Sequence, residues 1–181
     1  MNIANNIDLD SADILSWDSV IDDRFSVFVI YPNHQSFNHL KGIYFKLFGV
    51  GFLDFETMSI FIDGEEISKE GYTPDHLYAI EAHEIAHYIL EHDKKRQRPT
   101  TKEEKDADVA AIELLDFLKY HGAKDLLINR FKALYGPDYS IDGNLSEEDK
   151  TKLKEYLNER SPSVFQKAIN KIKSFLGFLK K

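Results

Sequence analysis

The sequence predicts an α+β fold, in which a small sheet in the first third of the chain is followed by helices. Two short segments rich in β-branched and aromatic residues, 25–31 and 58–64, predict the strands. From residue 73 onward, apolar residues recur at helical spacing behind capping residues. With 181 residues and no cysteine, the chain suits one domain that folds around its own core without disulfides.

The N-terminal elements are short. Residues 11–21 are interpreted as a brief amphipathic helix capped by Ser11. The strand over 25–31 ends at a Pro-Asn pair, and the strand over 58–64 ends at an Asp-Gly turn signal. Between them, residues 36–52 are ambiguous, because a helical beginning is followed by two glycines that interrupt it.

The later elements are helices with clear starting signals. Thr73 as N-cap and Pro74 in the first helical position predict a helix that runs to about His92. A Thr-x-x-Glu capping box at residues 100–103 begins a second helix that runs to about residue 120. Three more helices are expected over residues 123–134, from residue 146 onward, and over 161–181.

The helix predicted from residue 73 carries the motif H-E-x-x-H. His83 and His87 are four residues apart, so both imidazoles lie on one helix face and can bind one zinc ion. Glu84 lies about 100° round the helix, close enough to take a proton from a zinc-bound water as general base. The alternative is a pair of buried core histidines, and the pattern arises by chance in roughly 2% of shuffled chains. The apolar residues on the other helix faces indicate a buried helix, which favours ligands.

A catalytic zinc needs a third protein ligand, and the next helix offers four acidic residues. Glu104 and Asp108 lie 40° apart on its core face, whereas Glu103 and Asp106 point away from it. Glu104 is therefore the expected third ligand, and Asp108 the group that accepts a hydrogen bond from a ligand histidine. The opposite assignment, with Asp108 as ligand, stays open. Donor atoms more than about 4 Å apart would contradict the site, because zinc–ligand distances are near 2 Å.

These two motifs resemble those of the gluzincin metallopeptidases, in which H-E-x-x-H is followed on a second helix by a glutamate ligand and an acidic residue four positions later. The stretch EKDAD, residues 104–108, is similar to their E-x-x-A-D motif. Because both motifs occur in a short chain, the sequence is most similar to the ImmA/IrrE-type minimal gluzincins of bacteria and their mobile elements, over roughly residues 58–120. The resemblance implies a minimal zincin-like domain over residues 1–136, with a helical C-terminal extension, residues 137–181, packed on it.

The resemblance and the residues together predict a zinc-dependent metallopeptidase whose peptide substrate lies against an exposed strand, residues 58–62. One alternative is a catalytically inactive zincin-fold binding or regulatory protein of a bacterial or phage system. Another is a self-cleaving or host-targeting factor with a single substrate. The donor that would stabilise an oxyanion stays open among His76, Tyr78, Tyr88, Tyr120 and His121.

The charge distribution limits the partners. The net charge of −8 argues against nucleic acid, whose phosphates need clustered Lys and Arg. No signal peptide or membrane span is recognisable, so a cytoplasmic location is expected. Residues 164–181 carry five lysines, no acid and an apolar stripe. This segment is either a packing helix or a helix that docks on a membrane surface or a partner. Neither the substrate's identity nor the oligomeric state is indicated.

Overall fold

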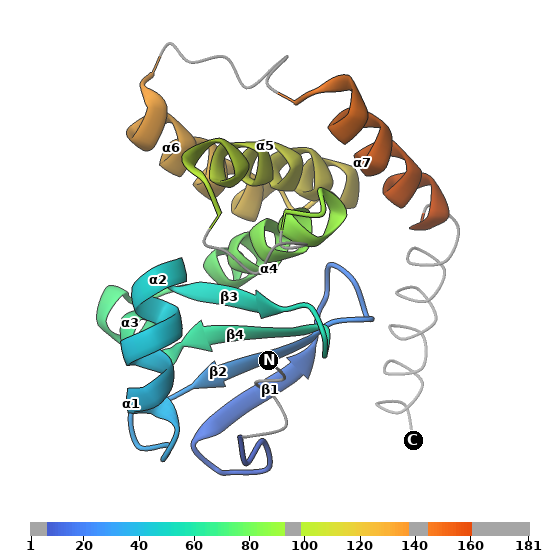
Figure 1. Cartoon of the computed structure of the whole chain (residues 1–181). Coiled ribbons are helices and arrows are strands. Elements are labelled where there is room, and N and C mark those ends of the chain that lie inside the picture. The colour runs from blue at the N-terminus through green and yellow to red at the C-terminus, as the bar shows by residue number, and fades with distance from the viewer. Residues whose placement is uncertain (1–6, 93–98, 138–144, 161–181) are drawn as a thin grey trace, which may run out of the picture.

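The computed structural model describes residues 7–92, 99–137 and 145–160, and has an α+β fold built on a four-stranded mixed sheet (Figure 1). The order across the sheet is β1-β2-β4-β3. The central strands β2 and β4 are parallel, and each edge strand is antiparallel to its neighbour. The strands are β1 (Ile14–Asp18), β2 (Ser26–Ile30), β3 (Gly51–Asp54) and β4 (Ser59–Asp63).

Helices lie at one end of the sheet and in a stack beyond β3 (Figure 1). The first group is α1 (Phe37–Leu40), a π-helical turn η2 (Lys41–Phe45), α2 (Lys46–Phe48) and α3 (Gly64–Glu70). The second group is α4 (Pro74–Ile89), α5 (Thr101–Leu118), α6 (His121–Tyr135) and α7 (Glu147–Arg160). Helix α4 contacts β3, α5 and α6, so it lies at the centre of the molecule. None of the helices in the described ranges is long and apolar enough to cross a membrane.

The helix expected over residues 11–21 is wrong, because Ile14–Asp18 forms the edge strand β1. Its register against β2 pairs Ile14 with Ile30 and Asp18 with Ser26. The Ser11 hydroxyl accepts a hydrogen bond from the Asp13 N–H in a turn instead of capping a helix. Apolar spacing over so short a segment fits either structure, and pairing with a neighbouring strand decides between them.

The strands over residues 25–31 and 58–64 are confirmed, but β4 is not an exposed strand. It lies between β2 and β3, so the edge strand beside α4 is β3, from the segment that the sequence left ambiguous. The Asp-Gly pair at the end of β4 begins a helix instead of a simple turn. The Asp63 side chain accepts hydrogen bonds from the N–H groups of Glu65 and Glu66, and so caps α3.

The two faces of the sheet are buried in different ways. Val27 and Ile60 belong to the core that also contains Ala82 and Ile85 of α4. The opposite face carries aromatic rings, with Phe61 stacked between Phe28 and Phe52 at centroid distances of 5.6 and 5.2 Å. Because α4 packs against the buried strands of the sheet, apolar burial holds it in position.

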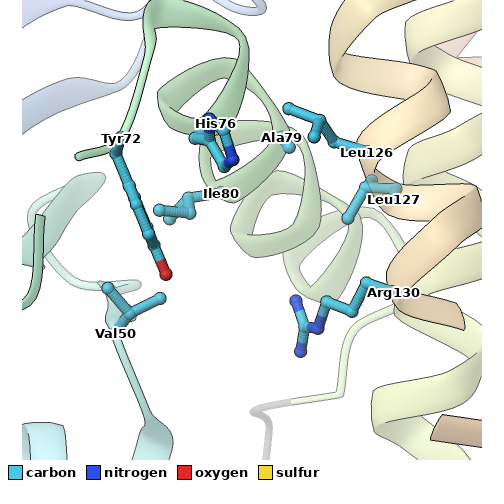
Figure 2. Close-up of a pocket in the computed structure, with 8 residues that line it drawn as sticks. All are labelled: Val50, Tyr72, His76, Ala79, Ile80, Leu126, Leu127 and Arg130. Carbon is cyan, nitrogen blue, oxygen red and sulfur yellow. The ribbon is translucent and has the colours of Figure 1, made fainter. Parts of the chain in front are cut away.

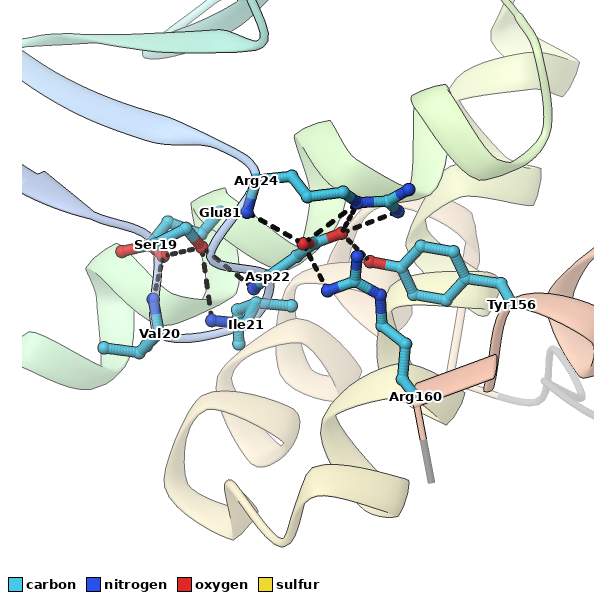
Figure 3. Close-up of polar contacts among 8 residues, drawn as sticks. All are labelled: Ser19, Val20, Ile21, Asp22, Arg24, Glu81, Tyr156 and Arg160. Atoms are coloured by element: carbon cyan, nitrogen blue, oxygen red, sulfur yellow. Dashed lines mark hydrogen bonds and ion pairs between the residues drawn. The ribbon is translucent and has the colours of Figure 1, made fainter. Parts of the chain in front are cut away.

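Two buried carboxylates join the β1–β2 connection to helices (Figure 3). Glu81 of α4 accepts hydrogen bonds from the indole of Trp17 at 3.0 Å and from the Ser19 hydroxyl at 2.5 Å. Asp22 is contacted by Tyr156 and Arg160 of α7. These contacts hold α4 and α7 against the same loop. The helix expected over 161–181, with its docking segment 164–181, lies outside the described residues.

Candidate metal centre

His83, His87 and Glu104 come together where α4 packs on α5. The two histidine side chains are buried, and the Glu104 side chain is 32% exposed. One ligand atom from each residue lies within 4.8 Å of the others, in a group that could hold a metal ion. The interface between the two helices thus brings together His83 and Glu104, which are 21 positions apart in the sequence.

The spacing of the donor atoms suits a tetrahedral ion. The two Nε2 atoms are 3.2 Å apart. Glu104 Oε2 is 3.3 Å from His83 Nε2, and Glu104 Oε1 is 3.9 Å from His87 Nε2. Ligands at about 2.0–2.1 Å around a tetrahedral centre are separated by about 3.3 Å. The nearest donor atoms of each pair of residues lie within the limit of about 4 Å, with Glu104 approaching the two histidines through different carboxylate oxygens. The donor set of two imidazoles and a carboxylate is one that zinc accepts.

Asp108 lies behind His83, on the side away from His87. Its Oδ1 is 2.8 Å from His83 Nδ1 and 3.7 Å from Arg130 Nη1, and its side chain is 1% exposed. The imidazole N–H does not point at the carboxylate, so neither group has a hydrogen-bond partner among the described residues. Burial would lower the pKa of His83, but Asp108 and Glu104 outweigh it and raise the pKa to about 9.

Glu84 is buried on α4 beside β3. Burial raises its pKa to about 7, with a further rise from the charge of Glu104. The backbone N–H of Leu53 donates a hydrogen bond to this carboxylate. A Cβ placed on Gly51 would lie 3.4 Å from Glu84 Oε1, so β3 approaches the carboxylate closely where it has no side chain. The glutamate therefore has a pKa near neutrality and a fixed position.

His87 contacts His92 as well as His83. The Nδ1 atoms of His87 and His92 are 3.0 Å apart, within hydrogen-bond distance. Burial, together with the charge of His83, holds the pKa of His87 well below its ordinary value. No role was predicted for His92 from the sequence. Its only sequence signal was its place at the predicted end of the helix.

Other acidic residues of α5 differ in their outcomes. Glu103 caps the helix as predicted, since its side chain accepts a hydrogen bond from the Thr100 N–H at 2.7 Å. Asp106 was expected to face solvent, but it is buried and bound to the Lys102 ammonium at 2.7 Å. Helix α7 contacts α5 in the folded chain, and helix angles alone cannot reveal such packing.

The candidates for an oxyanion donor are spread over different surroundings. His76 accepts a hydrogen bond from the Thr73 N–H with Nδ1, at the start of α4. Tyr88 packs edge-on against Phe25 in the core, at 5.3 Å between centroids. Tyr78 and Tyr120 contact one another, and His121 begins α6. The cation near the site is instead Arg130, which the sequence argument missed because only the packing of α6 brings it there.

A pocket of about 310 Å³ opens beside this site, between α4, α6 and the start of β3 (Figure 2). Its wall is largely apolar. Tyr72 and the guanidinium of Arg130 face into it from opposite sides (Figure 2). The lining residues are Val50, Tyr72, His76, Ala79, Ile80, Leu126, Leu127 and Arg130. Because Ile80 lies one helical turn before Glu84, the pocket continues the face of α4 that carries the motif.

Comparison with models of protein families, with curated proteins and with solved structures gives no match. The likeness to gluzincins therefore depends on the residues of the two motifs, and the function has to be inferred from the geometry of the site.

Proposed function

We propose that the chain is a zinc-dependent peptide hydrolase with a minimal zincin-like fold. The observation that carries this proposal is the convergence of His83, His87 and Glu104, with donor atoms close enough for one ion. Among the described residues, two imidazoles and one carboxylate form the group, which leaves a fourth position open as in catalytic zinc sites. A structural zinc site would instead be closed by four protein ligands.

Glu84 is the residue proposed to carry the chemistry. When bound, zinc polarises a carbonyl oxygen and lowers the pKa of water toward neutrality. Glu84 accepts the proton of the attacking water and returns it to the leaving amine, and its pKa of about 7 suits both transfers near neutral pH. Asp108 lies 2.8 Å from His83 Nδ1 and would accept the proton of that nitrogen when a metal is bound, which leaves His83 Nε2 free as a ligand.

The pocket beside Glu84 is proposed to receive one substrate side chain next to the scissile bond. Its apolar walls suit a medium-sized apolar residue, and its volume of about 310 Å³ accommodates one. The peptide would run past the start of β3, where Val50 lines the pocket. Arg130 brings a positive charge to this end of the site, where it can bind a carbonyl oxygen or developing oxyanion.

Glu84→Gln tests this proposal. We expect the parent protein to bind one zinc and to cleave peptides from an internally quenched library, with products identified by mass spectrometry. Glutamine has nearly the same shape but accepts no proton, so cleavage should fall by roughly 10²–10⁴-fold while zinc stays bound. His83→Ala should lose the zinc, and Glu70→Gln, at an exposed position on α3, serves as control.

Two results would contradict parts of this proposal. Cleavage by Glu84→Gln at the parental rate would show that Glu84 is not the base. Zinc binding by the parent without cleavage of any library peptide would favour the alternative, a zincin-fold binding or regulatory protein.

A further inference from the structure

The helix that carries the metal motif ends in a turn that brings the chain back onto His87. Leu90 ends the helix, and Glu91 follows with a left-handed backbone, φ +60°. The N–H of Glu91 donates to the Tyr88 carbonyl and the N–H of His92 to the His87 carbonyl, each at 3.1 Å. These two bonds form a Schellman motif. They fix His92 one turn beyond His87, with the ring centroids 5.1 Å apart.

The contact between the two rings has a defined direction. Their Nδ1 atoms are 3.0 Å apart, so one must donate and the other accept. His87 Nε2 faces His83 and Glu104, so binding a metal there requires the proton of His87 to be on Nδ1. His87 is then the donor, and His92 accepts through the lone pair of its own Nδ1.

The place of His92 in the fold is consistent with this arrangement. The ring is half-buried and packs edge-on against the His87 ring, with an interplanar angle of 69°. A neutral imidazole that carries its proton on the outer nitrogen, Nε2, leaves Nδ1 as acceptor. His92 does not itself extend the ligand set, because its Nδ1 faces the far side of the His87 ring.

We propose that His92 is a positioning residue for the metal centre, a neutral imidazole that accepts the Nδ1 proton of His87 and fixes the orientation of that ring. The proposal rests on the metal site of the proposed function. It gives each ligand histidine a partner of its own, Asp108 for His83 and His92 for His87. Because an imidazole acceptor is uncharged, it orients His87 without adding a further negative charge to a site that already holds Glu84, Glu104 and Asp108.

The first test compares three substitutions by competition for zinc with a chromophoric chelator. His92→Phe keeps a ring but has no acceptor, and should weaken zinc binding by roughly 10- to 100-fold. His92→Asn places an amide oxygen where Nδ1 was, and should stay closer to the parent. His39→Phe, on the exposed side of α1, is the matched control and should change nothing. Cobalt spectra of the first two variants report the ligand geometry directly, with a change expected only for His92→Phe.

The second test needs no catalysis. In the zinc-loaded protein labelled with ¹⁵N, the hydrogen bond should give a scalar coupling between Nδ1 of His87 and Nδ1 of His92, with the proton attached to His87. Absence of this coupling, or a proton on His92 Nδ1, overturns the proposal, as do equal zinc affinities in His92→Phe and His92→Asn. If the chain binds zinc but cleaves nothing, the peptidase proposal fails. The zinc affinities and the coupling between the two Nδ1 atoms still decide whether His92 positions His87.

Discussion

At the residue scale, Glu104 and Asp108 lie one turn apart on α5 and contact opposite edges of the same imidazole. Glu104 approaches His83 Nε2 and His87 Nε2, between the two histidines. Asp108 approaches His83 Nδ1 and is fully enclosed beside Arg130. A ligand needs access to the ion, whereas a group that orients a histidine lies behind it. These contacts favour Glu104 as ligand, which helix angles alone could not decide.

Zinc titration of alanine variants at these two positions tests the assignment. Asp108→Ala should weaken zinc binding by roughly 10- to 100-fold and still fill the site at saturating metal, because all three ligands remain. Glu104→Ala removes a ligand and should be more severe. Equal losses, or a milder effect of Glu104→Ala, would mean that the two roles are shared or reversed.

Arg130 contributes charge without contacting any proposed ligand directly. Its side chain is 46% exposed, and it faces the pocket (Figure 2). Arg130→Met should lower kcat/KM by roughly 10²-fold, the effect of removing one donor to an oxyanion, with zinc affinity nearly unchanged. Lys132→Met, on an exposed part of α6, is the control for loss of a cation. A parental kcat/KM in Arg130→Met would remove Arg130 from the mechanism.

At the element scale, the parts of the fold that sequence predicted are those specified locally. The capping signals at Thr73 and Thr100 give the starts of α4 and α5 because the bonds involved span three residues. Strands β1 and β3 were missed because they lack the run of β-branched and aromatic residues that marks β2 and β4, which are no longer. Pairing with a neighbouring strand decides their structure. The candidate ligands were found because each motif lies within a single helix. His92 and Arg130 were not found, because a turn after α4 positions His92 and the packing of a third helix, α6, positions Arg130.

The close approach of β3 to α4 makes Gly51 a test of this packing. A Cβ at Gly51 would lie 2.8 Å from Ile80 Cγ2, which requires one element to shift. Gly51→Ala should destabilise the fold by about 1–3 kcal/mol and displace Glu84, so that hydrolysis falls more than zinc affinity does. Gly42→Ala is the control, because no atom lies within 4 Å of its added Cβ. Urea unfolding and zinc titration of both variants provide the measurement, and a fully stable, active Gly51→Ala would contradict the tight contact.

At the scale of the whole molecule, Asp22 joins residues that are far apart in sequence. Its carboxylate binds the guanidinium of Arg24 in its own loop, and the Tyr156 hydroxyl donates to it at 2.5 Å across 134 positions. Arg160, at the end of α7, forms an ion pair with the same group. Nothing in the local sequence around Asp22 indicates these partners. The loop beside α4 and the helix α7 thus depend on one buried charge.

This charge predicts how stability depends on pH. Burial would raise the pKa of Asp22, but hydrogen bonds from Arg24 and Tyr156 outweigh it and lower the pKa below its ordinary 3.8. A carboxyl whose pKa is lower in the folded state stabilises the fold above its unfolded pKa, and this stabilisation is lost as the pH falls through the folded pKa.

Asp22→Asn should therefore lower the free energy of unfolding at pH 7 by about 1–3 kcal/mol, less than the loss for a fully enclosed pair because Arg24 stays partly exposed. The difference between parent and variant should shrink as the pH falls below about 4, where the parent also loses the charge. Urea unfolding at several pH values measures this, with Asp18→Asn on the exposed side of β1 as control. A difference that stays constant down to pH 2 would show that the carboxylate acts through its shape and neutral hydrogen bonds, and not through its charge.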